Sequence, residues 1–121
     1  MGLVSYVSYG EGEKDLVRSG IAAMREVLMG GDAGRKRRLL LALDWFMDPY
    51  YRQDLSEIYD DLVQLLQEVV LSSEEDVAED ALMLLTSYAW PPFRILAQNL
   101  EKVPERLRAE AQYAVGMGSG E

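Results

Sequence analysis

An internal match at a spacing of 43 residues constrains the fold of this chain more than any other feature. Segment 39–50 aligns with segment 82–93, and both are apolar runs with helical character. In each run an aromatic residue, Trp45 or Tyr88, stands four positions before a proline, and a second aromatic residue follows that proline. A period of this length is typical of stacked helical pairs, whose usual task is to present a surface to a partner.

Apolar positions at helical spacing predict six helices and no sheet. The expected helices cover residues 15–29, 35–47, 54–71, 73–88 and 93–103, with a sixth starting at Pro104. Gly20 falls inside the first helix, where we expect it to permit close helix contact and not to break the helix. Asp54 or Ser56 is expected to cap the third helix. A capping-box variant opens the fourth helix at Ser73.

The odd-numbered helices repeat as well, at an offset of 41 residues, so the helices recur as pairs. The predicted fold is therefore all-α, with three stacked antiparallel helix pairs, of which the third is shortened. We expect residues 1–12 to form an extended N-terminal arm, residues 13–115 a single helical-repeat domain, and residues 116–121 a flexible tail. A closed six-helix bundle is the main alternative, because medium helices with short loops also produce a spacing near 40 residues.

On these matched segments the chain resembles α-solenoid repeat proteins of the HEAT and armadillo type. The resemblance covers residues 13–115 and is carried by the repeat length, the pairing of helices and the segments around Trp45 and Tyr88. The pattern departs from typical HEAT repeats, because the prolines lie between pairs and the basic residues cluster only at 35–38. The resemblance implies a right-handed stack with a curved face that binds protein.

Composition excludes much chemistry and favours a binding role. The chain has no cysteine and no histidine, which removes disulfides, thiolate metal sites and histidine-based catalysis. Twelve basic and 21 acidic residues give a net charge of −9, which disfavours nucleic acid and anionic membranes and suits a basic protein partner. No apolar run approaches the ~20 residues of a membrane span, so we expect a cytoplasmic protein without cofactor.

The acidic middle of the chain and two exposed apolar candidates form the predicted partner-binding surface. Carboxylates at a spacing of four residues share a helical face, and Trp and Met are frequent interface anchors. The predicted partner-binding residues are Glu57, Asp61, Glu75, Glu79, Asp80, Met83 and Trp90. The same carboxylates also suit a solvated helix face, and the tryptophans and tyrosines near the repeat turns suit the core between repeats.

The only basic cluster, Arg35-Lys36-Arg37-Arg38, supports an alternative function. It stands at a predicted helix N-terminus, where the helix dipole disfavours positive charge. Either it pairs internally, with Asp32, Asp60 or Asp61, or these four residues form an anion- or phosphate-binding site of a regulatory domain. In the 43-residue alignment this basic segment stands opposite an acidic one, which indicates an asymmetric role for the two repeats.

We therefore predict a small acidic protein-interaction module without catalytic activity. Small acidic helical proteins include adaptor subunits and immunity-type proteins that neutralise toxins, and this comparison is an analogy. Self-association through the first or last helix pair is a further expectation. A metal protein or carboxylate-only enzyme that uses Asp44 with Asp48, or Glu57 with Asp61, is the remaining alternative.

Overall fold

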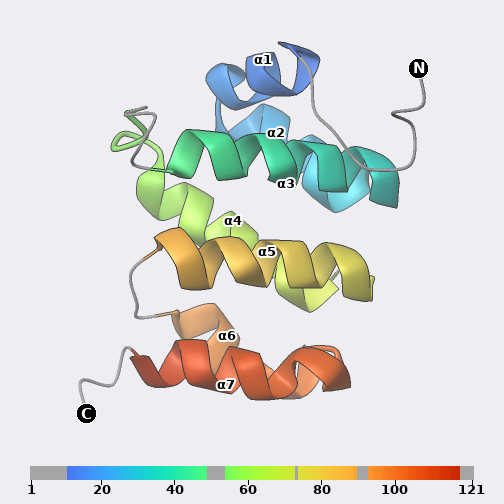
Figure 1. The fold of residues 1–121 in the computed structure, drawn as a ribbon, viewed down its shortest axis with the longest axis vertical. Coiled ribbons are helices and arrows are strands. Elements are labelled where there is room, and N and C mark those ends of the chain that lie inside the picture. Colours follow the sequence, from blue (N-terminus) through green and yellow to red (C-terminus); the bar gives the residue numbers. More distant parts are fainter. Residues whose placement is uncertain (1–10, 49–53, 73, 90–92, 118–121) are drawn as a thin grey trace.

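The computed structural model describes residues 11–48, 54–72, 74–89 and 93–117, and within these residues every regular element is a helix (Figure 1). The all-α prediction is confirmed for this part of the chain. The α-helices are α1 (Glu11–Ser19), α2 (Ile21–Gly30), α3 (Ala33–Met47), α4 (Tyr59–Ser72), α5 (Glu75–Tyr88), α6 (Arg94–Gln98) and α7 (Arg108–Met117). Two 3₁₀ turns, η3 (Leu100–Lys102) and η4 (Glu105–Leu107), lie between α6 and α7.

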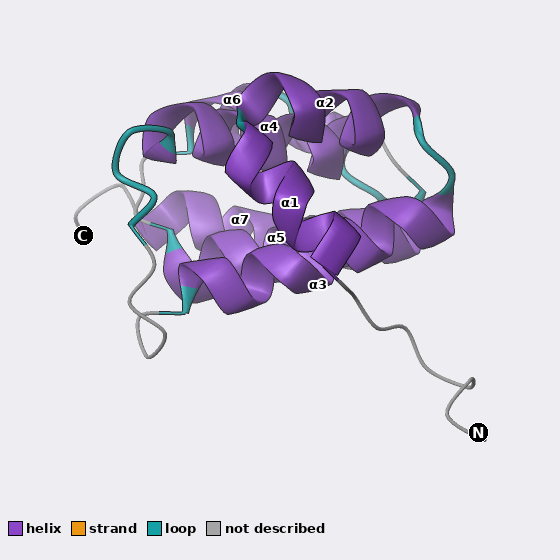
Figure 2. Ribbon diagram, turned by 90° about the horizontal axis from the view of Figure 1, so that it is seen from above, coloured by secondary structure: helices purple, strands orange, loops and turns teal. Residues whose placement is uncertain are grey.

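The helices lie in two rows. Figure 2 shows α2, α4 and α6 along one side of the molecule and α3, α5 and α7 along the other. Seen from the side, α2 with α3, α4 with α5, and α6 with α7 occupy three successive levels, which we call tiers, and α1 lies across the first tier (Figure 1). Each tier therefore contacts the next through both rows.

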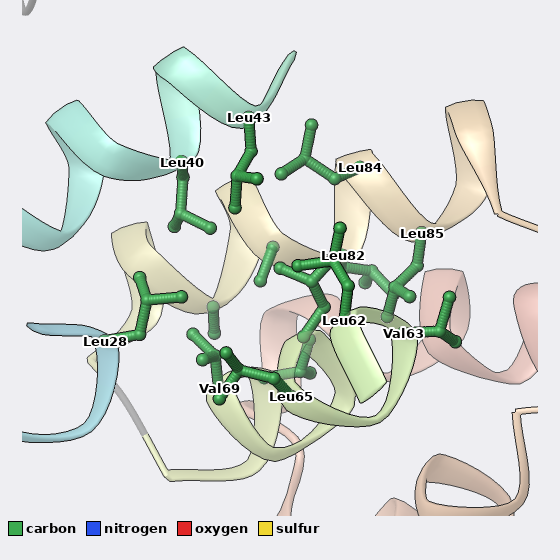
Figure 3. Close-up of a cluster of buried hydrophobic side chains, with 14 of the residues drawn as sticks. Leu28, Leu40, Leu43, Leu62, Val63, Leu65, Val69, Leu82, Leu84 and Leu85 are labelled. Atoms are coloured by element: carbon green, nitrogen blue, oxygen red, sulfur yellow. The ribbon is translucent and has the colours of Figure 1, made fainter. Parts of the chain in front are cut away.

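One apolar core runs through the tiers (Figure 3). Leucines and valines of α2 to α5 meet at its centre, where Leu43, Leu65 and Leu82 are fully buried. Helix α3 buries five apolar side chains against α1, α2 and α5. In the last tier Leu107 of η4 and Ala111 and Ala114 of α7 are buried as well.

Gly20 breaks the first predicted helix, so the expectation of one helix over 15–29 is wrong. The residue has φ 106° and ψ −177°, a conformation that is essentially restricted to glycine. The chain turns there between α1 and α2. This turn lets α1 lie across α3, where its buried Val17 joins the core.

A local turn delays the start of the third predicted helix. The Asp54 carboxylate accepts hydrogen bonds from the backbone N–H and the hydroxyl of Ser56, at 3.0 and 2.7 Å. Such side-chain bonds compete with the helix, and α4 begins only at Tyr59. Glu57 consequently lies in the turn, so its expected place on one helical face with Asp61 is wrong.

Other boundaries also differ from expectation. Helix α1 starts at Glu11, inside the predicted arm, and α7 continues to Met117, inside the predicted tail. The expected helix over 93–103 is the short α6 followed by η3. Ser73 of the predicted capping box, the rest of the arm and residues 118–121 lie outside the described residues.

Gln67 holds the short α6 in place, and the periodicity gave no reason to single it out. Its side chain is 4% exposed in α4. Its Oε1 accepts hydrogen bonds from the backbone N–H groups of Ile95 and Leu96, at 3.0 and 3.2 Å. Phe93, at the N-cap position, offers no side-chain acceptor, so Gln67 caps α6 from a neighbouring helix.

Candidate functional site

The predicted partner-binding residues separate into two groups. Glu75, Glu79, Asp80 and Met83 lie on α5, in the row of α3, α5 and α7 (Figure 2). Glu57 precedes α4 and Asp61 lies in it, in the other row. Trp90 lies outside the described residues. The α5 group is therefore the part of the predicted surface that forms one site.

Two polar contacts fix α3 and α5 side by side in parallel register. Arg37 Nε donates to Asp80 Oδ2 at 2.8 Å, and the Tyr88 hydroxyl donates to Asp44 Oδ1 at 2.6 Å. The first pair spans 43 positions, which is the spacing of the internal match, and the second spans 44. Arg37 and Asp80, which the internal alignment sets opposite each other, thus pair and neutralise one another.

Between these two contacts the surface is hollowed into a notch. It has a volume of about 120 Å³ and is lined by Arg37, Leu40, Leu41, Asp44, Asp80 and Met83. Leu40 is buried and belongs to the core, so it forms the apolar floor (Figure 3). Met83 is 44% exposed and stands at the edge. The volume equals about four water molecules, so the notch accepts the end of one aliphatic side chain.

Carboxylates dominate the charge around the notch. The pKa of Arg37 is raised, first by its hydrogen bond to Asp80 and also by the negative charges of Asp80, Asp76 and Glu79. One guanidinium therefore stands among three carboxylates. Asp80 Oδ1 and Asp44 Oδ2 accept no hydrogen bond from any residue that the structure describes. Because a carboxylate has about four acceptor sites, both can take a further donor.

The remaining acidic residues of α5 are partly neutralised by the third tier. Arg106 donates to Glu75 and to both carboxylate oxygens of Glu79, the shorter of the Glu79 contacts being 3.1 Å. These contacts join the start of α5 to the turn before α7. Glu75 and Glu79 thus hold tiers together as well as facing solvent.

Tyr113 of α7, 70% exposed, is the most exposed large apolar side chain among the described residues.

In the other row, Arg25 pairs with Glu68, and Asp61 adds a second negative charge. Arg25 donates to both oxygens of Glu68, at 2.6 and 3.3 Å, and this contact again spans 43 positions. The hydrogen bond between Arg25 and Glu68 lowers the pKa of Glu68 and raises the pKa of Arg25, to which the charge of Asp61 adds a smaller contribution. Glu57 lines a separate cavity of about 230 Å³ beside Gly20. The structure therefore does not bring Glu57 and Asp61 to the notch.

The basic cluster at the start of α3 is largely engaged within the molecule. Arg37 pairs with Asp80, and Lys36, 8% exposed, pairs with Glu74 at 3.7 Å. Asp32 accepts from the backbone N–H of Arg35, and the side chains of Arg35 and Arg38 are exposed. Internal pairing was expected with Asp32, Asp60 or Asp61. The observed partners lie on α5 and in the turn before it.

The described aromatic residues near the repeat turns pack inside the molecule. Phe93 is buried, and Trp45 is half-buried against Phe46 in an edge-to-face contact with ring centroids 5.0 Å apart. The ammonium of Lys14, from α1, stands 4.3 Å from the centre of the Trp45 ring. Trp45 therefore attaches α1 to the first tier.

Sequence reasoning missed Leu41 and Asp44 as parts of the notch, and assigned Asp44 only to a metal or enzyme site. The 43-residue alignment already held the signal, because it sets Arg37 against Asp80. Two helical turns further along, the same register reaches Asp44 and Ser87, and Tyr88, the partner of the Asp44 carboxylate, is the next residue.

Comparison with known proteins gives no assignment: no family model, no curated protein and no solved structure matches the chain. Within the described ranges, no group of three or more carboxylates is arranged to hold a metal ion. None of the helices described is long and apolar enough to cross a membrane.

Proposed function

We propose that the chain is a small protein-interaction module, that its contact face is the row of α3, α5 and α7, and that it works without catalysis. The observation that carries the proposal is the notch, where the exposed Met83 stands over an apolar floor between carboxylates. An apolar anchor site with a charged rim is the arrangement that protein interfaces use at their centres.

A HEAT-like α-solenoid is the architecture that we propose for this module. Three tiers with helices in two rows, and contacts between tiers at the repeat spacing, support it (Figures 1 and 2). The α1 helix covers the first tier, which in this view makes α1 a cap for the N-terminal end of the stack. Open ends of such a stack favour self-association, and α7 with the exposed Tyr113 is the end available for it.

The partner is a basic protein surface or segment. The net charge of −9 attracts such a partner over distances of about a Debye length, which raises the rate of encounter. The carboxylates of Asp44 and Asp80 then receive its basic groups beside the notch. A neutralising or adaptor role, which rests on analogy with other small acidic helical proteins, needs only such a face. The lack of histidine and cysteine is consistent with a role outside catalysis.

Selection from a displayed library of random 16-residue peptides tests the proposal. The bait is the full chain, and every enriched peptide is tested against Met83→Asp. Because Met83 is 44% exposed, this substitution alters the surface and leaves the core intact. The matched control is Met29→Asp, since Met29 of α2 is 40% exposed in the other row.

We expect enriched peptides that compete with each other, lose binding to Met83→Asp and keep binding to Met29→Asp. Circular dichroism of both variants checks that each is folded. If the enriched peptides bind both variants as well as the wild type, or if no peptide is enriched, the proposed face is wrong.

An anion-binding regulatory role for Arg35, Lys36, Arg37 and Arg38 remains our second candidate. Arg35 and Arg38 are exposed, whereas Lys36 and Arg37 pair with Glu74 and Asp80. This candidate requires that phosphate raises the melting temperature and that Arg35→Ala with Arg38→Ala removes the rise.

A further inference from the structure

We infer that the notch binds an amphipathic helix of a partner protein, and that this helix carries one apolar side chain between two basic residues seven positions apart. The inference rests on the proposed function and specifies the partner of that same site. It follows from the distance between the two carboxylates and from the surroundings of the notch.

The register of α3 and α5 sets the distance between the carboxylates. Asp80 is level with Arg37, because the two side chains are in contact at 2.8 Å. Asp44 lies seven residues further along α3, which is a rise of about 10.5 Å. Leu41 and Met83 stand between these levels, so an acidic, an apolar and a second acidic group follow one another along the groove.

Compared with a β-strand, a helix matches this distance with side chains on one face. In a helix, residues i, i+4 and i+7 share a face, and i to i+7 spans about 10.5 Å. In an extended segment, residues on one face are two or four apart, which gives about 6.6 or 13 Å. Basic residues at i and i+7 therefore reach Asp80 and Asp44 while the apolar residue at i+4 enters the notch.

The backbone chemistry of the notch also favours a helix. The lining residues lie in the middle of α3 and α5, where backbone groups bond within their own helix. An extended partner would place its own N–H and C=O groups against Leu41 and Met83 without backbone partners on this face. A partner helix satisfies its backbone internally and presents only side chains.

Three synthetic peptides of 18 residues test the inference by fluorescence anisotropy with the full chain. All are built on an alanine–glutamine host with blocked ends. The first carries arginines at i and i+7 with leucine at i+4. The second has the same composition and helicity but its arginines stand at i+2 and i+9, away from the leucine face. The third keeps the first spacing and contains two prolines that prevent helix formation.

We expect the first peptide to bind about three to ten times more tightly than the second and third, the effect of two exposed charge pairs. Asp44→Asn removes one of the two charge pairs and should reduce the advantage of the first peptide to about two- to three-fold. This substitution keeps an acceptor for Tyr88, whose hydroxyl is 2.6 Å from Asp44 Oδ1. Asp60→Asn, which makes the same change in net charge on exposed α4 surface, should preserve the advantage.

Equal binding of the first two peptides, or equal weakening by Asp44→Asn and Asp60→Asn, would overturn the inference, because either result means attraction by net charge alone. Binding of the proline peptide as tight as that of the first would show an extended partner instead. If library peptides require Met83 but lack the helical spacing, the inference fails and the proposed face stands. If none requires Met83, both fail.

Discussion

Replacing Gln67 by methionine should loosen the third tier, because this side chain is the N-terminal cap of α6. Methionine keeps the length of the side chain and removes the acceptor. The N–H of Leu96 is buried and that of Ile95 is half-buried, and both lose their partner, Gln67 Oε1. The donor bond from Gln67 Nε2 to the Val63 carbonyl, 3.3 Å long, is lost as well.

The size of the effect follows from these groups. A buried donor without a partner costs about 1–3 kcal/mol, and the half-buried one costs less because water can reach it. The Val63 carbonyl keeps its bond within α4, so its loss adds little. We therefore expect Gln67→Met to lower the free energy of unfolding by about 2–3 kcal/mol, which for a domain of this size is a fall in Tm of roughly 10 °C.

Urea denaturation followed by circular dichroism measures this difference, with Gln112→Met as the control. Gln112 is exposed on α7, so the same substitution there should change the free energy of unfolding by less than about 0.5 kcal/mol. Hydrogen exchange locates the effect: the amides of Ile95 and Leu96 should exchange faster while those in the middle of α5 do not. A Gln67→Met protein as stable as Gln112→Met, with unchanged exchange at these amides, would refute the capping role.

Three further perturbations test the backbone and the contacts between tiers. Gly20→Ala should lower the free energy of unfolding by about 1–3 kcal/mol, because φ 106° excludes a β-carbon even though no atom lies within 4 Å of it. A double-mutant cycle with Arg37→Ala and Asp80→Ala should give a coupling of about 0.5–1 kcal/mol that falls in 1 M salt, since both side chains are about one-third exposed. The hydrogen bond from Arg25 lowers the pKa of Glu68 in the folded protein. The ionised Glu68 therefore stabilises the fold fully above its ordinary pKa of 4.5, and this stabilisation is lost as the pH falls through the lower folded-state pKa. Glu68→Gln should consequently lose less stability than the wild type between roughly pH 5 and 3.

Gly20→Ala has a matched control variant, and each of the other two predictions has an outcome that would contradict it. Gly30→Ala makes the same change in open space at the end of α2, without a positive φ, and should shift stability by less than about 0.5 kcal/mol. Equal losses for Gly20→Ala and Gly30→Ala would contradict the conformational argument. A coupling of zero at low salt would show that the Arg37–Asp80 pair does not stabilise the contact between α3 and α5. If the wild type and Glu68→Gln lose the same stability as the pH falls, Glu68 does not contribute to the acid dependence.

The sequence predicts the helices because their apolar stripes persist over several turns. Leu39 and Leu43 in α3, like Leu62 and Leu66 in α4, stand four positions apart and are all buried, as periodicity requires. The break at Gly20 could not be predicted, because a glycine on an apolar stripe is compatible with close packing and with a positive φ alike. Only the placement of α1 across α3 decides between the two.

The candidate site was predictable in part. Met83 was predicted as an exposed anchor on the apolar run 81–85, and the opposite charges of Arg37 and Asp80 were visible in the internal alignment. The notch was not visible, because it depends on α3 and α5 lying in register, a property of two segments that are distant in sequence. Glu57 was misplaced for a local reason, since the turn closed by Asp54 competes with the helix.

The methyl group of Met83 gives the most direct test of the proposed contact face. In a protein labelled with ¹³C at its methionine methyl groups, NMR titration with the peptide that carries two arginines and one leucine reports each methionine separately. The proposal predicts that the Met83 signal shifts and saturates, while the signals of Met29, exposed in the other row, and of the buried Met24 stay in place. A stationary Met83 signal, or equal shifts of Met29 and Met83, would contradict a contact face on α3 and α5.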